Sequence, residues 1–322
     1  MKFLVALFLL ITTVLSAQDL TKFSYQELDS LAQIEITKGQ YILAKPYAEE
    51  GQNRAKIEYG GEDTISAMFA VHLGRVYSEQ GNYKESLKSY TKVFDIYENI
   101  LEQSNPKYIK SLSDLANTNT RLGNYDKSKQ IFNKAIAVCK KHSKENTEEY
   151  TILLNSLAFV YYNLREYEAC VPFLVESSKI QKKIKGAKDP EYAKFLFNIS
   201  VVYRMMGSYE EAEPLLLNAG KIWKESLGGK HPDYASFLDG AANLYTTLGK
   251  YEDAESFYLE SLAIKKETIG EQAPHYRYSI QNLAYLYTLM EKFKKAEALY
   301  LELILLAEKR VGKQHIDYAI YL

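Results

Sequence analysis

The chain repeats itself every 42 residues, and this period constrains its fold more than any other feature. An aromatic residue recurs at this spacing, and the third residue after it is small in every repeat. The aromatic positions are Tyr41, Tyr83, Tyr125, Tyr167, Tyr209, Tyr251 and Phe293. A fixed period of this length predicts a solenoid, in which each repeat packs only on its neighbours.

Each repeat has the pattern of two amphipathic helices joined by a short turn. Between Phe237 and Leu248, apolar residues recur at three- and four-residue spacing, which places them on one face of a helix. Gly249 follows, a residue that can end a helix in the left-handed conformation without a Cβ clash. A second apolar face then runs from Tyr251 to Leu262. Neither helix can bury its face alone, so we expect stacked helical hairpins and an all-α fold.

The period divides the chain into seven repeats. They span 20–61, 62–103, 104–145, 146–187, 188–229, 230–271 and 272–313. Prolines share one position early in the second helix of three repeats, at Pro46, Pro172 and Pro214. Because only a first-turn proline costs a helix nothing, we expect these helices to begin late.

Residues 314–322 resemble the start of the repeat at 230–271. We interpret them as the beginning of an incomplete eighth repeat. This interpretation predicts that the sequence is the N-terminal piece of a longer protein. It also predicts end-to-end self-association, because the last complete repeat would leave apolar surface uncovered.

Residues 1–17 have the pattern of a secretory signal peptide. Lys2 precedes the apolar run 3–15, and the small residues Ser16 and Ala17 follow it. The run is short for a membrane span, although an uncleaved anchor is the alternative interpretation. We therefore predict cleavage near Ala17 and export to the periplasm or the cell exterior.

Charge and motifs exclude several function classes. The 40 basic and 41 acidic residues are spread along the chain, without the basic stripe of a nucleic-acid-binding surface. We expect no membrane insertion within 18–322, because no second long apolar run occurs there. His231, His275 and His315 lie near inter-repeat turns, too far apart to share a metal ion. With no catalytic or phosphate-binding motif present, we expect no enzyme, cofactor or metal site.

The two cysteines are expected to remain unpaired. The repeat register places Cys139 and Cys170 about 16 Å apart along parallel helices. A disulfide spans Cα atoms within about 7 Å, so we interpret both as small buried residues.

The residues that carry the period also carry a family resemblance. Leu238, Ala242, Tyr245, Ala254 and Tyr258 match the large–small–Tyr–Ala–aromatic spacing of tetratricopeptide repeats. The 42-residue period resembles the subtype found in kinesin light chains. This resemblance implies a right-handed α-α superhelix whose first helices line a concave, partner-binding face.

Carried across the repeats, the resemblance gives a set of inward-facing residues for that face. They are Arg75, Asn117, Arg121, Asn155, Phe159, Tyr162, Arg204, Asn243, Gln281 and Tyr285. Amides, guanidinium groups and rings suit an extended peptide, although the same residues also fit an ordinary solvated helix face. Val71 and Asp239 stand where the subtype usually has Asn, which weakens the expectation of backbone capture there.

Three functions fit these observations. The first is a scaffold that binds a peptide or protein partner. The second is the sensor array of a larger protein, such as a caspase-like CHAT peptidase, which this repeat subtype often precedes. The third is the exported half of a membrane-tethered signalling protein.

The repeat also predicts which side chains form the core. The expected most buried positions are Leu73, Tyr77, Leu115, Leu157, Tyr161, Ile199, Tyr203, Leu244, Tyr245, Leu283 and Tyr287.

Overall fold

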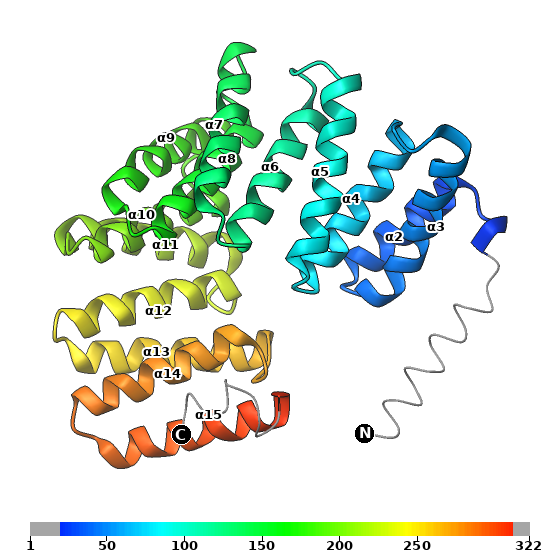
Figure 1. Ribbon diagram of the computed structural model, residues 1–322. Coiled ribbons are helices and arrows are strands. Elements are labelled where there is room, and N and C mark those ends of the chain that lie inside the picture. The colour runs from blue at the N-terminus through cyan, green and yellow to red at the C-terminus, as the bar shows by residue number, and fades with distance from the viewer. Residues whose placement is uncertain (1–19, 312–322) are drawn as a thin grey trace. The chain divides into compact units, whose positions relative to one another are not determined.

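The computed structural model describes residues 20–311, and these residues form helices and no strand (Figure 1). The predicted all-α fold is confirmed. The signal peptide at 1–17 and the incomplete repeat at 314–322 lie outside the described residues. A short 3₁₀ turn, η1 (Leu20–Lys22), precedes the first helix.

Fourteen α-helices follow within the described residues. They are α2 (Tyr25–Thr37), α3 (Tyr41–Tyr59), α4 (Thr64–Glu79), α5 (Tyr83–Ile100), α6 (Pro106–Arg121), α7 (Tyr125–Lys141), α8 (Glu148–Asn163), α9 (Tyr167–Lys185), α10 (Pro190–Met205), α11 (Tyr209–Leu227), α12 (Pro232–Thr247), α13 (Tyr251–Thr268), α14 (Pro274–Leu289) and α15 (Phe293–Val311). None of them combines the length and hydrophobicity needed to cross a membrane.

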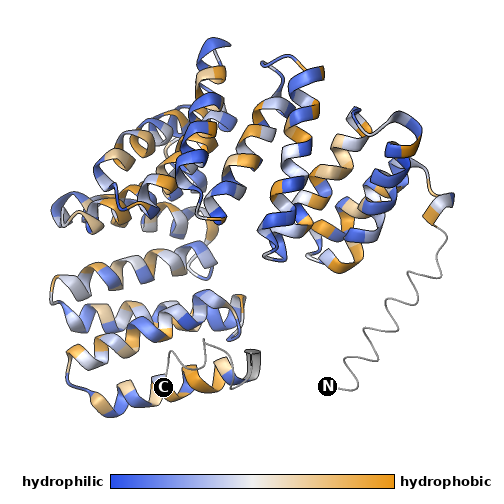
Figure 2. Cartoon of the chain, in the orientation of Figure 1, coloured by the Kyte–Doolittle hydropathy of each residue, from blue (hydrophilic) through white to orange (hydrophobic). Residues whose placement is uncertain are grey.

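The chain forms two compact units, residues 1–160 and 161–322. In the first unit, each helix from α2 to α6 packs against the helix that follows it. In the second unit, the helices from α9 to α15 pack in the same sequential way, and α12 also touches α10 and α14. Hydrophobic and hydrophilic residues alternate around the helices, as amphipathic packing requires (Figure 2). This nearest-neighbour packing is what a repeat array predicts.

The turn inside each hairpin uses one backbone motif, whether or not it contains glycine. At Gly249 the backbone is left-handed, with φ of 73°. The amide of the next residue, Lys250, donates to the carbonyl of Tyr245 at 2.8 Å, which closes the helix end. Arg165 and Glu291 occupy the same position in their repeats and keep the left-handed conformation, with φ of 61° and 56°. Packing of the hairpin therefore imposes this geometry even where a Cβ makes it costly.

One core cluster of the second unit is formed mainly by α10, α11 and α12. Phe237 packs so closely on Gly220 that an added Cβ would lie 2.5 Å from the ring. Leu216, Trp223 and Leu238 are buried in the same cluster. The Trp223 indole also donates to the Pro190 carbonyl at 3.0 Å, which ties α11 to the start of α10.

Two expectations about packing were wrong in part. The predicted core leucines and isoleucine are buried, as is Tyr287, but Tyr77, Tyr161, Tyr203 and Tyr245 are only half-buried. At Tyr245 the hydroxyl lies near the surface, where it donates to Glu213 at 2.9 Å.

The three helices with an early proline do not begin late. Pro46, Pro172 and Pro214 lie inside α3, α9 and α11, which start at the same repeat position as the other second helices. Pro172 and Pro214 are solvent-exposed. The start is determined by the turn and by packing on the preceding helix, which together outweigh the loss of one helical hydrogen bond.

Glu255 on α13 connects the last two hairpins. It accepts hydrogen bonds from Tyr287 at 2.8 Å, Lys292 at 2.7 Å and Lys295 at 3.1 Å. Burial opposes ionisation of the carboxyl, but the hydrogen bonds from the two lysines and the tyrosine outweigh it and hold the pKa of Glu255 at about 2.

Both cysteines are buried, and neither forms a disulfide. Burial raises the pKa of Cys139 to about 11 and that of Cys170 to about 12. Thiols of this kind stay protonated and unreactive at neutral pH.

Candidate functional site

The predicted contact residues of the first unit lie on its first helices. Arg75 on α4 and Arg121 on α6 are exposed, and the Arg121 guanidinium lies 5.7 Å from the centre of the Tyr83 ring. Asn117 on α6 and Asn155 on α8 are half-buried, whereas Phe159 on α8 is 55% exposed.

The predicted contact residues of the second unit include two that meet at one cavity. Arg204 on α10 and Asn243 on α12 both line it, and both are half-buried. Tyr162, at the end of α8, packs against the Tyr167 ring instead. Gln281 is half-buried on α14, and Tyr285 is exposed on the same helix.

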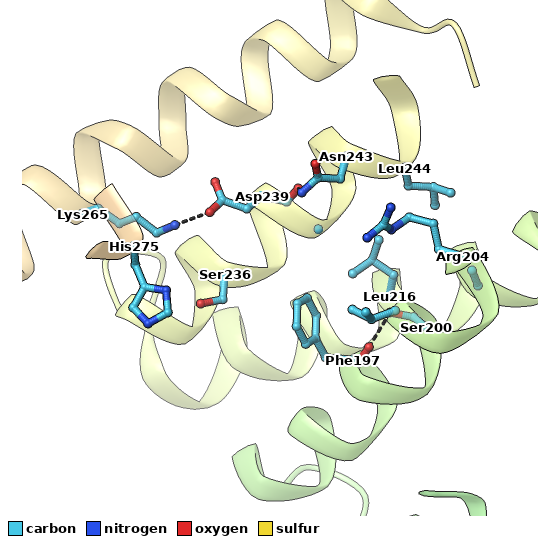
Figure 3. A pocket seen from close by; sticks show the side chains of 13 residues that line it. Phe197, Ser200, Arg204, Leu216, Ser236, Asp239, Asn243, Leu244, Lys265 and His275 are labelled. Atoms are coloured by element: carbon cyan, nitrogen blue, oxygen red, sulfur yellow. Dashed lines mark hydrogen bonds and ion pairs between the residues drawn. The ribbon is translucent and has the colours of Figure 1, made fainter. Parts of the chain in front are cut away.

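The cavity has a volume of about 250 Å³ and lies within the second unit (Figure 3). Five helices, α10 to α14, contribute to its wall. The lining residues are Phe197, Ser200, Val201, Arg204, Ala212, Leu216, Ser236, Asp239, Gly240, Asn243, Leu244, Lys265 and His275. It therefore combines apolar walls with a few charged and polar groups, a composition typical of binding pockets.

Arg204 supplies a cation to this cavity that the described part of the chain leaves unpaired. Its guanidinium extends from α10 toward α12 (Figure 3). Among the described residues, no carboxylate forms an ion pair with it, unlike the nearby Lys265, which pairs with Asp239. A half-buried guanidinium without a partner is a suitable donor for a carboxylate ligand.

Asp239 is held in place by a buried network from two other helices. One carboxylate oxygen, Oδ2, pairs with Lys265 of α13 and accepts a hydrogen bond from Ser279 of α14 at 2.8 Å. The Lys265 ammonium also contacts the Ser279 hydroxyl at 2.8 Å, and the lysine residue is only 3% exposed. The other oxygen, Oδ1, is buried and has no hydrogen-bond partner among the described residues.

Asn243 already uses its side chain inside the protein. Its amide nitrogen donates to the Asp239 carbonyl at 2.8 Å, and its oxygen accepts from the Tyr258 hydroxyl at 2.9 Å. Contact with a peptide backbone would therefore use only the remaining hydrogen-bonding capacity of this amide. Its predicted binding role stays a prediction.

Sequence reasoning gave no site role to five polar residues that line this cavity: Ser200, Ser236, Asp239, Lys265 and His275. A signal for Lys265 was present in the repeat register. The same position holds Trp223 one repeat earlier and Ala307 one repeat later, and both are buried. A lysine at a buried repeat position indicates a buried counter-charge, which here is Asp239.

Exposed rings lie on the neighbouring first helix. Tyr278 and Tyr285 of α14 are 60% and 55% exposed, and their seven-residue separation places them on one side of the helix. In residues 20–308, no three His, Cys, Asp or Glu side chains converge as metal ligands.

Family comparison identifies the type of repeat. Tetratricopeptide repeat profiles match residues 66–141, 148–219 and 196–267, and a second tetratricopeptide repeat profile matches 278–317. These matches cover more than half of the sequence. The chain belongs to the tetratricopeptide repeat (TPR) family. No curated protein sequence matches this TPR chain.

Solved structures show the same fold at low sequence identity. TPR-like repeats of kinesin light chain type from Podosopora anserina are 20% identical, with a TM-score of 0.56 over 62% of this chain and 94% of that one. Aspartyl phosphate phosphatase F from Bacillus subtilis is 14% identical, with a TM-score of 0.67 over 91% and 71%. A Pyrococcus horikoshii signal transduction ATPase with a TPR sensor is 15% identical, with a TM-score of 0.63 over 94% and 47%.

Proposed function

We propose that this TPR chain is an interaction scaffold that binds a peptide or protein on the first-helix face. By first-helix face we mean the surface formed by the first helices of the repeats. In the second unit it includes Arg204, Asn243, Gln281 and Tyr285. The observation that carries the proposal is the unpaired guanidinium of Arg204 in a cavity bounded by α10 and α12.

The chemistry of this face suits an extended peptide. Arg204 can pair with a carboxylate of the partner, and such charge-assisted bonds are among the stronger ones in proteins. The exposed Tyr278 and Tyr285 rings offer flat apolar surface with a polar tip, as at many interfaces. The membership in a repeat family supports the same use, because solenoids present extended binding surfaces.

A selection experiment can test the proposal without a known partner. Peptides chosen from a random displayed library for binding to the whole chain would be titrated against variants by fluorescence anisotropy. Arg204→Ala should weaken binding by about 1.5–3 kcal/mol, or roughly 10- to 150-fold. Its melting temperature should stay unchanged, because Arg204 has no ion pair within the described residues to lose.

The matched control is Lys221→Ala. Lys221 is an exposed cation of the same unit but belongs to the second helix α11. Peptides that lose affinity with Lys221→Ala and not with Arg204→Ala would place the binding surface on the second helices. The proposed first-helix face would then be wrong.

A second candidate is a sensor array within a larger protein. It is favoured by the likeness to the Pyrococcus horikoshii protein, in which TPR repeats are described as the sensor of a signal transduction ATPase. The downstream gene sequence tests it. An effector domain in frame after residue 322, such as a peptidase or a kinase, supports the sensor role, and a stop codon argues against it.

We also infer that the chain is exported through residues 1–17. The support is the sequence pattern alone, with one lysine, a short apolar run and small residues at 16 and 17. Intact-mass measurement of the protein recovered from the periplasm or medium should show loss of the leader. A full-length mass in the cytoplasmic fraction alone would contradict export.

A further inference from the structure

We propose that the second helices of the second unit form a docking surface for a second copy of this chain. The surface is the solvent-facing side of α9, α11, α13 and α15, and we call it the second-helix face. The proposal goes beyond the scaffold function and does not rest on it, because the peptide site proposed above lies on the first helices.

A leucine recurs at one exposed repeat position of this face. Leu217 on α11, Leu259 on α13 and Leu301 on α15 are 42 residues apart, and they are 43%, 49% and 53% exposed. Val175 holds the same position on α9 and is half-buried. We call these four residues the leucine row. In the first unit the position is polar, with Glu49, Thr91 and Asn133. Exposed leucines that recur in one unit only indicate a contact surface.

Stacking of the repeats does not cover the leucine row. Leu217 and Leu259 stay exposed although α14 and α15 follow them in the stack. A further repeat after α15 would leave Leu301 exposed in the same way, because it occupies the same repeat position. Whatever covers the row therefore comes from outside the array.

Charged residues flank the row at a constant spacing on each helix. Seven residues before the row position, the exposed side chains on α9, α11 and α13 are Glu168, Glu210 and Glu252. Seven residues after it, the exposed side chains are Lys182, Lys224 and Lys266. α15 has the reverse order, with Lys294 before Leu301 and Glu308 after it. Seven residues are close to two helical turns, so these charges lie on the same side of each helix as the row, about 10.5 Å from it.

This pattern is complementary to itself. When a two-fold axis runs along the leucine row, each helix lies antiparallel on the same helix of the second copy. Each row residue then faces its equivalent, and each flanking glutamate faces a lysine. The reversed order on α15 obeys the same rule, because Lys294 faces Glu308 of the second copy. A two-fold interface requires a self-complementary surface, which a surface fitted to a different protein does not need.

The charges also select the direction of the axis. A two-fold axis parallel to α13 would place Glu252 against the same residue of the second copy, and like charges in contact are unfavourable. The antiparallel arrangement avoids this contact on all four helices. The leucine row is narrow and has polar ends, and small interfaces of this kind form transient complexes. We therefore expect a weak dimer, with a Kd on the order of 10 μM.

Sedimentation velocity of the whole chain tests the dimer, over concentrations from about one tenth to about twenty times this Kd. The sedimentation coefficient should rise with concentration toward that of a dimer. Leu259→Glu places a carboxylate opposite the same residue of the second copy and should abolish the rise. Leu289→Glu is the matched control, because Leu289 is an exposed leucine of the same unit that lies on the first helix α14. Its association should equal that of the unmodified chain.

A charge exchange tests the antiparallel arrangement. Within the described residues, neither Glu210 nor Lys224 forms an ion pair, whereas Lys266 already pairs with Glu271. Glu210→Lys and Lys224→Glu each bring like charges together at two symmetric positions, so each should weaken the dimer about threefold or more. The double variant restores opposite charges at both positions and should dimerise like the unmodified chain.

Three results would overturn the proposal. A chain that stays monomeric over the whole concentration range would assign the leucine row to a different protein. Association that survives Leu259→Glu would place the contact elsewhere, for example at the end of the array. A double variant that dimerises no better than the single charge variants would exclude the antiparallel two-fold arrangement.

Discussion

Replacing Lys265 with methionine should destabilise the second unit by about 3–5 kcal/mol, the range for breaking a buried ion pair from one side. The Lys265 side chain is 4% exposed and that of Asp239 is 18% exposed. Partial access of water to Asp239 places the expected cost near the lower end of this range. The loss arises mainly because the Asp239 carboxylate stays in place without its counter-ion.

A double variant of Lys265 and Asp239 separates the interaction energy of the pair from the contribution of each residue. Gln281 occupies the repeat position of Asp239 in the next repeat, so Asp239→Gln introduces a side chain that this position already accepts. Asp239→Gln alone should also be costly, because it leaves Lys265 as a buried cation. Combining it with Lys265→Met removes both charges, and the double variant should be more stable than the sum of the single losses by at least about 2 kcal/mol.

The chain carries its own reporter for this measurement. Trp223 is the single tryptophan, lies in the second unit and is buried. Urea unfolding followed by tryptophan fluorescence therefore reports on the second unit, while circular dichroism follows all helices. Lys266→Met is the matched control, since Lys266 is 62% exposed and pairs with Glu271 on the surface. Its effect should be within about 1 kcal/mol. A loss below about 1 kcal/mol for Lys265→Met, or additive single variants, would refute the reasoning.

Three further predictions concern the last two hairpins. Because the folded pKa of Glu255 is about 2, below its ordinary value of 4.5, its stabilising contribution is present above pH 4.5 and is lost as the pH falls toward 2. Glu255→Gln should therefore lower the urea midpoint at pH 7 and lose this difference near pH 2. Glu297→Gln, at the same repeat position on α15, is the matched control, and it should leave the urea midpoint at pH 7 unchanged because Glu297 is exposed. Glu291→Gly should stabilise the array by about 0.5–1 kcal/mol in urea unfolding, since relief of the left-handed strain exceeds the added chain entropy. Gly249→Ala, at the equivalent turn, should destabilise the array by about 1 kcal/mol or more, because it adds a Cβ to a left-handed residue.

The repeat pattern was sufficient to predict the helical hairpins and the family. A period of 42 residues repeats the same local choices, so an amphipathic face, a turn and a small residue at fixed spacing determine each hairpin locally. Nearest-neighbour packing then needs no contacts distant in sequence. The same register places Arg165 and Glu291 in the turn, two residues before Tyr167 and Phe293, although neither is glycine.

Sequence reasoning was less accurate for side chains that pack against a neighbouring helix with some atoms and face solvent with others. The half-buried tyrosines and the internal prolines depend on which atoms face a neighbouring helix and which face solvent, and helix spacing does not specify this at the level of single atoms. The candidate contact residues show the same limit. Arg204 was identified from its repeat position, but the sequence does not reveal that its guanidinium is left unpaired while Lys265 is neutralised.

The 42-residue repeat is sufficient to predict the local structure, because every repeat contains the residues for its helices, its turn and its packing face. The cavity and its chemistry depend instead on how the hairpins pack against one another. Asp239, Lys265 and Ser279 come from three helices and meet through distances that depend on how each hairpin settles on the next. Burial then converts those contacts into a fixed network, since a charge removed from water must find its partner within hydrogen-bond distance.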